Sequence, residues 1–169
     1  MPDLSLTEFA SLLTGMVGEI EHAAHEGLEQ AAQIVEREAK AELGHYQQGA
    51  GPFAPWAELA DSTKDDRVRQ GYPENEPGLR SGAMRDGIQH VVQGRTAHVG
   101  SDDDKLVFFE LGAVKQPPRA VLAGSLIRKT DAVAHAVGHR FVGRLFGEGV
   151  VGGSIPIAGG EDVGRVVSE

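Results

Sequence analysis

The sequence of 169 residues contains no cysteine and few aromatic residues. Without cysteine, neither a disulfide framework nor a thiolate metal site can form, which fits assembly in a reducing cytoplasm. Aromatic residues make up 5% of the chain and hydrophobic residues 40%, so we expect a core of Leu, Val, Ile and Ala. No apolar run approaches the ~20 residues that span a membrane, and no membrane partner is expected. Residues 1–9 include Asp3 and Glu8 and lack the basic region of a secretory signal.

The chain also lacks a dense cluster of Lys and Arg, and its net charge is −9. A protein that grips DNA through the phosphates presents a basic face, so this mode of binding is not favoured. Negative charge facing DNA would repel it and let it slide. Alternatively, the negative charge only aids solubility. The sequence leaves both interpretations open.

Motifs that carry catalysis are absent or incomplete. The sequence has no Walker A loop, no Gly-x-Gly-x-x-Gly fingerprint and no Gly-x-Ser-x-Gly elbow. His135 and His139 have a spacing that could bind zinc, but the glutamate of the metalloprotease signature and a third ligand are missing. The run Asp102-Asp103-Asp104 lacks the spacing of a calcium loop. We therefore expect no catalytic residues, no metal and no cofactor, and keep a small metal-binding hydrolase as an alternative.

Two helices frame the predicted domain. Residues 4–43 carry apolar side chains at steps of three and four, which predicts a long helix. Glycines at 15 and 18 weaken its first part, so residues 5–14 form a separate short helix in an alternative interpretation, with Ser-x-x-Glu as a capping box. Residues 125–146 are predicted as the second helix. Most of the glutamates of the first helix are expected on its outer face: Glu19, Glu21, Glu26, Glu29, Glu36 and Glu42.

A long connection and a small sheet are predicted between these helices. Residues 44–80 are rich in Gly and Pro, with a short helix over 62–70. Alternating polarity over 84–92 and 96–100 predicts an antiparallel pair of strands. The pattern of residues 106–111 fits a helix or a strand equally, and residues 119–123 are expected to form a further strand.

These elements define an α+β class, with a long N-terminal helix and a C-terminal helix packed on a small antiparallel sheet. We expect one domain over residues 1–146 and a Gly- and Val-rich arm over residues 147–169. Because the arm cannot bury a core of its own, we expect it to contact a neighbouring chain as an added strand.

Two side chains in the middle of the chain have competing interpretations. Trp56 is the only tryptophan. We expect it to pin the long connection to the core, with docking on a neighbouring subunit as the alternative. Glu110 lies inside an apolar run and is expected to be paired, with Arg80, Arg85 and Arg119 as candidate partners. A tuned general base is the alternative for Glu110.

A series of short motifs resembles a known family. In chain order they are Pro55-Trp56-x-x-Leu59-Ala60-x-Ser62-Thr63, Leu79-Arg80-Ser81-Gly82-x-Met84-Arg85-Asp86, Val99-Gly100-Ser101, Phe109-Glu110-Leu111-Gly112 and Pro117-Pro118-Arg119. Their order over residues 18–146 resembles the tailed-phage neck and minor-tail proteins, which include virion-morphogenesis and tail-completion proteins. The Tyr-rich lead of that family is replaced here by residues 106–109, and its Pro-Phe after the arginine by Ala120-Val121. These departures affect the subfamily that the chain would belong to, more than the fold that the resemblance implies.

The resemblance implies a structural virion protein that is not an enzyme, assembled in the host bacterial cytoplasm. It would be a subunit of a ring at the head–tail joint, between the portal-side connector and the tail tube. Expected partners are head–tail connector or adaptor proteins, the tail tube or tail terminator protein, and double-stranded DNA that passes without sequence-specific binding. By analogy a six-fold ring is favoured and a twelve-fold ring is possible. A tail-terminator ring protein is the alternative role.

The residues expected at interfaces are Trp56, Arg67, Arg69, Arg80, Arg85, Glu110 and Arg119. Four of these arginines also support a rival of another class, a nucleic-acid-binding module that uses Arg67, Arg69, Arg80 and Arg85.

Overall fold

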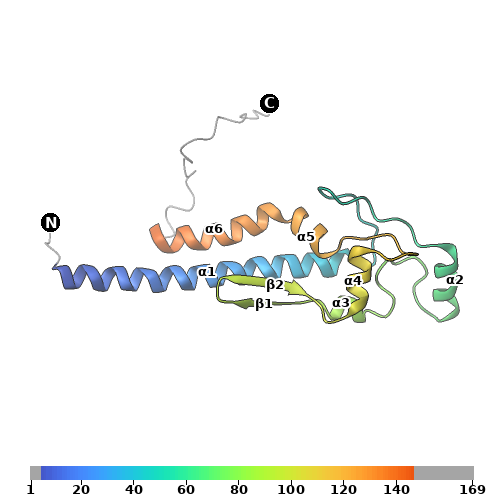
Figure 1. Cartoon of the computed structure of the whole chain (residues 1–169), viewed down its shortest axis with the longest axis horizontal. Helices are drawn as coiled ribbons and strands as arrows, with labels where there is room; N and C mark the ends of the chain where they lie inside the picture. The colour runs from blue at the N-terminus through green and yellow to red at the C-terminus, as the bar shows by residue number, and fades with distance from the viewer. Residues whose placement is uncertain (1–4, 147–169) are drawn as a thin grey trace, which may run out of the picture.

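The computed structural model describes residues 5–146 (Figure 1). Its elements are α1 (Leu6–Glu42), α2 (Asp61–Arg69), α3 (Ala83–Asp86), β1 (Gln89–Gln93), β2 (Thr96–Gly100), α4 (Asp104–Leu111), α5 (Leu122–Arg128) and α6 (Thr130–Phe146). The long helix α1 lies between α6 on one side and the β1–β2 hairpin on the other. This arrangement confirms the predicted α+β class. The predicted arm over residues 147–169 lies outside the described residues.

Helix α1 is one continuous helix of 37 residues, so the alternative of a separate short helix is wrong. It begins with the predicted capping box: the Ser5 hydroxyl accepts the backbone N–H of Glu8 at 3.3 Å, and the Glu8 carboxylate accepts the N–H of Ser5 at 2.8 Å. Small residues then allow close packing with α6. A Cβ added at Gly27 would lie 3.0 Å from Cα of Val137, so only glycine fits this crossing without a shift.

The end of α1 corrects one prediction. Glu42, expected on the outer face, is 3% exposed and pairs with Arg128 of α5. Burial raises the pKa of Glu42, and the Ser125 hydroxyl and the Arg128 guanidinium oppose that rise. The sequence pattern missed this because α1 is covered from more than one side. A single outer face therefore does not exist near its C-terminus.

The core lies where the C-terminal end of α1 meets α4 and the segment before α5. Its buried side chains are Ala39, Leu43, Trp56, Ile88, Leu106, Phe109 and Val121. Three of them, Ala39, Ile88 and Val121, are fully buried. Aliphatic side chains thus dominate the core, as the low aromatic content predicts, with one tryptophan and one phenylalanine among them.

The hairpin confirms the predicted antiparallel pair in part. His90 lies opposite Val99 in the register, and both point inward while their neighbours on the strands point outward. The first strand was predicted from residue 84, but residues 83–86 form α3, which begins after Gly82 at a φ of 86°. Gly82 in this left-handed conformation turns the chain and starts a helical turn, which overrides the alternating polarity.

Three other segments differ from or complete the predictions. Residues 104–111 are helical as α4, with Asp103 as a cap that accepts the N–H of Lys105 at 2.9 Å. The expected strand over residues 119–123 is wrong, because this stretch leads directly into α5. The second helix divides into α5 and α6 at Lys129, whose ψ of 13° departs from helical geometry. Each of these boundaries depends on local capping or backbone angles that apolar periodicity does not detect.

Candidate interface site

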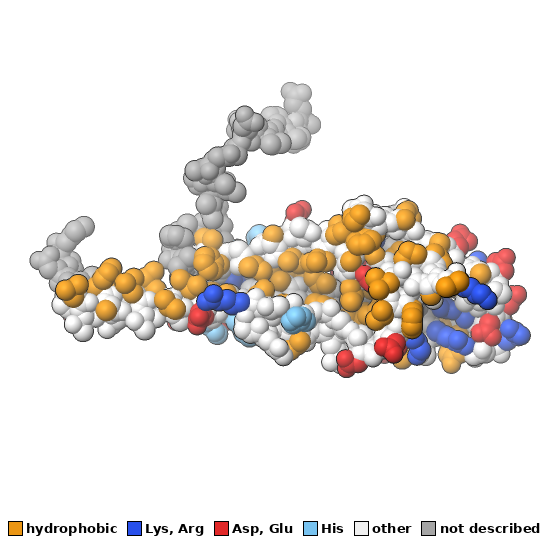
Figure 2. Space-filling model, in the orientation of Figure 1, with side chains coloured by type: hydrophobic (Ala, Val, Ile, Leu, Met, Phe, Trp, Pro, Cys, Tyr) orange, Lys and Arg blue, Asp and Glu red, His pale blue; other side chains and the backbone are white. Residues whose placement is uncertain are grey.

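A groove of about 630 Å³ lies between α2, α3, α4 and the segment that precedes α5. Its lining includes five Lys or Arg side chains and two acidic ones, in a chain whose net charge is −9. The basic members are Arg67, Arg80, Lys105, Lys115 and Arg119. Figure 2 shows basic and acidic side chains over this end of the molecule, the end that carries α2. The groove is therefore a locally basic feature of an acidic protein.

Arg119 forms the floor of the groove and joins its walls. The guanidinium is 4% exposed and donates to the carbonyl oxygen of Ala57 from Nε at 3.1 Å and from Nη2 at 2.7 Å. It also lies over the ring of Phe109, 5.4 Å from the centroid. Burial lowers the pKa of Arg119, which still keeps its charge at neutral pH. Arg119 thus attaches the long connection to α4.

Arg67 has a similar structural role at the far end of the connection. Its side chain is 7% exposed and donates to the carbonyl oxygens of Glu76 at 2.6 Å and Pro73 at 3.4 Å. Burial is the main reason that the pKa of Arg67 is lowered. The arginine closes the loop that follows α2, so the connection has a defined shape despite its Gly and Pro content.

Three arginines predicted at interfaces lie on the surface with acidic neighbours. Arg80 stacks over the ring of Tyr72 at 4.8 Å and lies 3.4 Å from the Asp66 carboxylate. Arg69 lies 3.4 Å from the same carboxylate, and Arg85 lies 2.9 Å from Asp86. Nearby carboxylates therefore offset much of the positive charge that the nucleic-acid alternative would need.

The other two predicted residues are structural. Trp56 is 5% exposed and packs edge-on against Phe109 with ring centroids 5.5 Å apart, which confirms that it pins the connection to the core. Glu110 is paired, but not with an arginine. Its carboxylate accepts the backbone N–H groups of Val121, Leu122 and Ala123 at 2.6, 3.0 and 3.0 Å. It therefore caps α5, whose own N-cap residue supplies no side-chain hydrogen bond.

The histidines of the zinc alternative lie side by side on α6. The rings of His135 and His139 have centroids 5.2 Å apart. Among residues 5–146, no group of three or more His, Asp or Glu side chains is placed to hold a metal ion. In the same part of the chain, no helix is long and apolar enough to cross a membrane.

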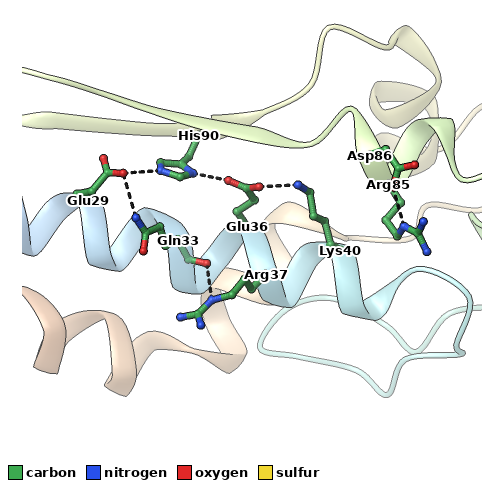
Figure 3. Close-up of polar contacts among 8 residues, drawn as sticks. All are labelled: Glu29, Gln33, Glu36, Arg37, Lys40, Arg85, Asp86 and His90. Atoms are coloured by element: carbon green, nitrogen blue, oxygen red, sulfur yellow. Dashed lines mark hydrogen bonds and ion pairs between the residues drawn. The ribbon is translucent and has the colours of Figure 1, made fainter.

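Sequence reasoning missed a polar cluster between the hairpin and α1 (Figure 3). His90 lies between two carboxylates of α1, with Nδ1 on Glu36 and Nε2 2.9 Å from Glu29. The hydrogen bond to Glu36, and then the one to Glu29, raise the pKa of His90. Lys40 adds a bond to Glu36 at 2.5 Å. The sequence did contain a signal for this cluster. His90 is at an inward-facing position in the alternating pattern of its strand, and Glu29 and Glu36 are seven residues apart, which places them on one face of the helix.

The fold and the groove define a structural class: a helical rod with a hairpin on its side and an arginine-tied loop region at one end. Comparison with known proteins gave no matching family model, no matching curated protein and no matching solved structure.

Proposed function

We propose that this chain is a structural virion protein of a tailed phage or phage-like particle, a subunit of a ring at the head–tail joint. In this role it connects the portal-side connector to the tail tube and lets DNA pass. The observation that carries the proposal is the ordered series of motifs that resembles neck and tail-completion proteins. The proposal includes no catalytic residue and no cofactor.

The positions of the motif residues support this proposal. Four of the five motifs contribute side chains or backbone to the lining of one groove, although they span residues 55–119. Examples are Leu59 from the first motif, Arg80 from the second, Phe109 from the fourth and Arg119 from the fifth. When the members of a family share one surface or one local fold, the residues that carry the resemblance are expected to lie close together in space.

The groove has the properties of a contact surface between protein subunits. Its buried arginines hold the long connection in place, so a partner would meet a preformed surface and lose less conformational freedom. Arg80 and Phe108 are 46% and 56% exposed at its edge, and both residue types are enriched at protein interfaces. We propose that this end of the subunit faces a neighbour in the ring or the adjoining connector, with six copies favoured and twelve possible.

The test is assembly of the full chain with candidate connector and tail-tube proteins, followed by mass measurement of the complexes. We expect a closed ring with a partner, and Arg80→Glu should reduce its formation. Arg95→Glu is the matched control, because Arg95 is 82% exposed on the hairpin and contacts Glu21. Equal assembly by both variants would remove the groove from the interface, and no assembly with any partner would contradict the ring.

The same preparation tests the alternatives. Near-stoichiometric zinc in the purified protein would favour the hydrolase that uses His135 and His139. DNA binding that weakens steeply with salt would favour the nucleic-acid module. A ring that forms on the end of a tail tube without a connector would favour the tail-terminator role.

A further inference from the structure

The first three turns of α1 expose a row of large apolar side chains. They are Leu6 (88% exposed), Phe9 (52%), Leu12 (53%), Leu13 (47%), Met16 (48%) and Val17 (57%), hereafter the N-terminal stripe. Figure 1 shows that this part of α1 extends beyond α6 and the hairpin, and Figure 2 shows apolar side chains along its upper edge. Contiguous apolar surface of this kind marks an interaction site more often than a free surface.

The N-terminal stripe continues the face of α1 that α6 covers. At about 100° per residue, Phe9, Leu13 and Met16 lie within about 40° of Gly27 around the helix axis. Gly27 is the residue that faces Val137 of α6. The covered part of this face carries small residues, with Ala23 and Ala31 buried, whereas the uncovered part carries large ones. The large residues therefore have the position of a helix–helix contact, but none of the described residues covers them.

Residues 6–18 have little reason to be helical without a partner. The stretch from Phe9 to Gly18 contains no charged residue, so it has no ion pairs along the helix. It includes Gly15 and Gly18, each unfavourable in a helix, and an added Cβ at either would meet nothing within 4 Å. Helices in proteins are stabilised mainly by packing of an apolar face. The helical form of this segment thus points to a partner that covers the stripe.

The spacing of the stripe favours another helix of the same kind. Leu6, Phe9, Leu13, Met16 and Ile20 follow steps of three, four, three and four, the pattern of a coiled-coil seam. A lipid surface fits less well, because membrane-surface helices carry Lys or Arg on their polar face and this chain has none before Arg37. We propose that the N-terminal stripe pairs with the same stripe of a second copy of this chain.

This inference goes beyond the proposed ring, because pairing of identical stripes is a two-fold contact, whereas a cyclic ring joins different surfaces of neighbouring subunits. The stripe offers six exposed apolar side chains over three turns, whereas a standard interface uses about 20–30 residues from each partner. We therefore expect weak, concentration-dependent pairing in isolation, with a dissociation constant on the order of 10 μM.

The test is sedimentation of the full-length chain alone over a range of concentrations. We expect wild type to self-associate and Leu13→Glu to weaken that association by more than about tenfold, because the stripe would bury a carboxylate. Ser11→Glu is the matched control, since Ser11 is exposed on the opposite face of the same turns. A wild-type chain that stays monomeric, or a Ser11→Glu chain that dissociates as much as Leu13→Glu, would overturn the proposal.

Two further variants identify the contact directly. Because the chain has no cysteine, Leu13→Cys introduces a unique thiol, and we expect it to form a disulfide-linked dimer that Ser11→Cys does not form. Gly18→Ala should tighten association about fivefold by favouring the helix, and no tightening would contradict coupling between helix formation and pairing. If the chain stays monomeric but binds neutral phosphatidylcholine vesicles, the partner is a lipid surface and the proposal fails.

The failures of the two proposals are distinguishable. Self-association through the stripe without any ring in the presence of connector proteins would contradict the proposed function and leave this inference standing. A wild-type chain that stays monomeric when alone, but forms a ring with a connector protein, would contradict this inference and leave the proposed function standing.

Discussion

The carboxylate of Glu110 offers the sharpest test of how this fold is held together. It accepts three backbone N–H groups at the start of α5, including that of fully buried Val121. Hydrogen bonds to a charged group contribute about 1.5–3 kcal/mol, and an unsatisfied buried N–H costs about 1–3 kcal/mol. Because Leu122 and Ala123 are only half-buried, water can replace part of the loss. We therefore expect Glu110→Ala to reduce the free energy of unfolding by about 2–4 kcal/mol.

Glu110→Gln should reduce the free energy of unfolding by about half as much as Glu110→Ala. One side-chain oxygen remains to accept the N–H groups of Val121 and Leu122, while the amide NH2 group faces the N–H of Ala123. Urea unfolding followed by circular dichroism would measure both variants. Glu58→Gln serves as the control, since its side chain is 81% exposed and we expect a change within about 0.5 kcal/mol. A loss below about 0.5 kcal/mol for Glu110→Ala would refute the reasoning. A catalytic turnover abolished by Glu110→Gln would favour an enzyme instead.

Three other predictions follow from the contacts of single residues. The pKa of His90 is raised in the folded state, so its stabilising contribution is complete below about pH 6.5 and is lost as pH rises through the raised pKa. Unfolding measured against pH should therefore show stability falling over that window in wild type, and a smaller fall in His90→Gln. Arg119→Ala should cost about 2–4 kcal/mol and make the long connection sensitive to protease, because the carbonyl oxygen of Ala57 loses both bonds; unchanged proteolysis would contradict this role. Gly27→Ala should destabilise the protein by about 1–3 kcal/mol through a close contact with Val137, whereas Gly15→Ala, which meets open space, should stabilise it by up to about 1 kcal/mol. The opposite order of these two in thermal unfolding would show that α6 does not pack on α1 in this way.

The parts of the fold that could be predicted are those with local, repeated signals. The apolar period of residues 4–43 predicted the helix, and the Ser5-x-x-Glu8 pattern predicted its capping box, although the helix itself begins at Leu6. The alternation around His90 gave the hairpin with the correct inward parity. The single tryptophan was correctly expected in the core, because a large apolar side chain in a connection is most stable when buried.

The parts that could not be predicted depend on contacts between distant segments. Glu42 is buried because α5 supplies Arg128 from far along the chain. Glu110 lies next to the N–H groups of α5 only after the Pro117-Pro118 segment has turned the chain back. The arginines of the groove show the same limitation. Composition indicated possible interface residues, but it could not show that Arg67 and Arg119 bond to backbone carbonyl oxygens within the chain.

The most direct test of the proposed ring is the mass of the full-length protein in solution, alone and mixed with candidate connector and tail-tube proteins. We predict weak self-association of the chain alone and a closed ring, six-fold in the favoured case, when the correct partner is present. A chain that remains monomeric with every such partner, at concentrations well above the dissociation constant of about 10 μM expected for stripe pairing, would contradict the proposal that it is a ring subunit of the head–tail joint.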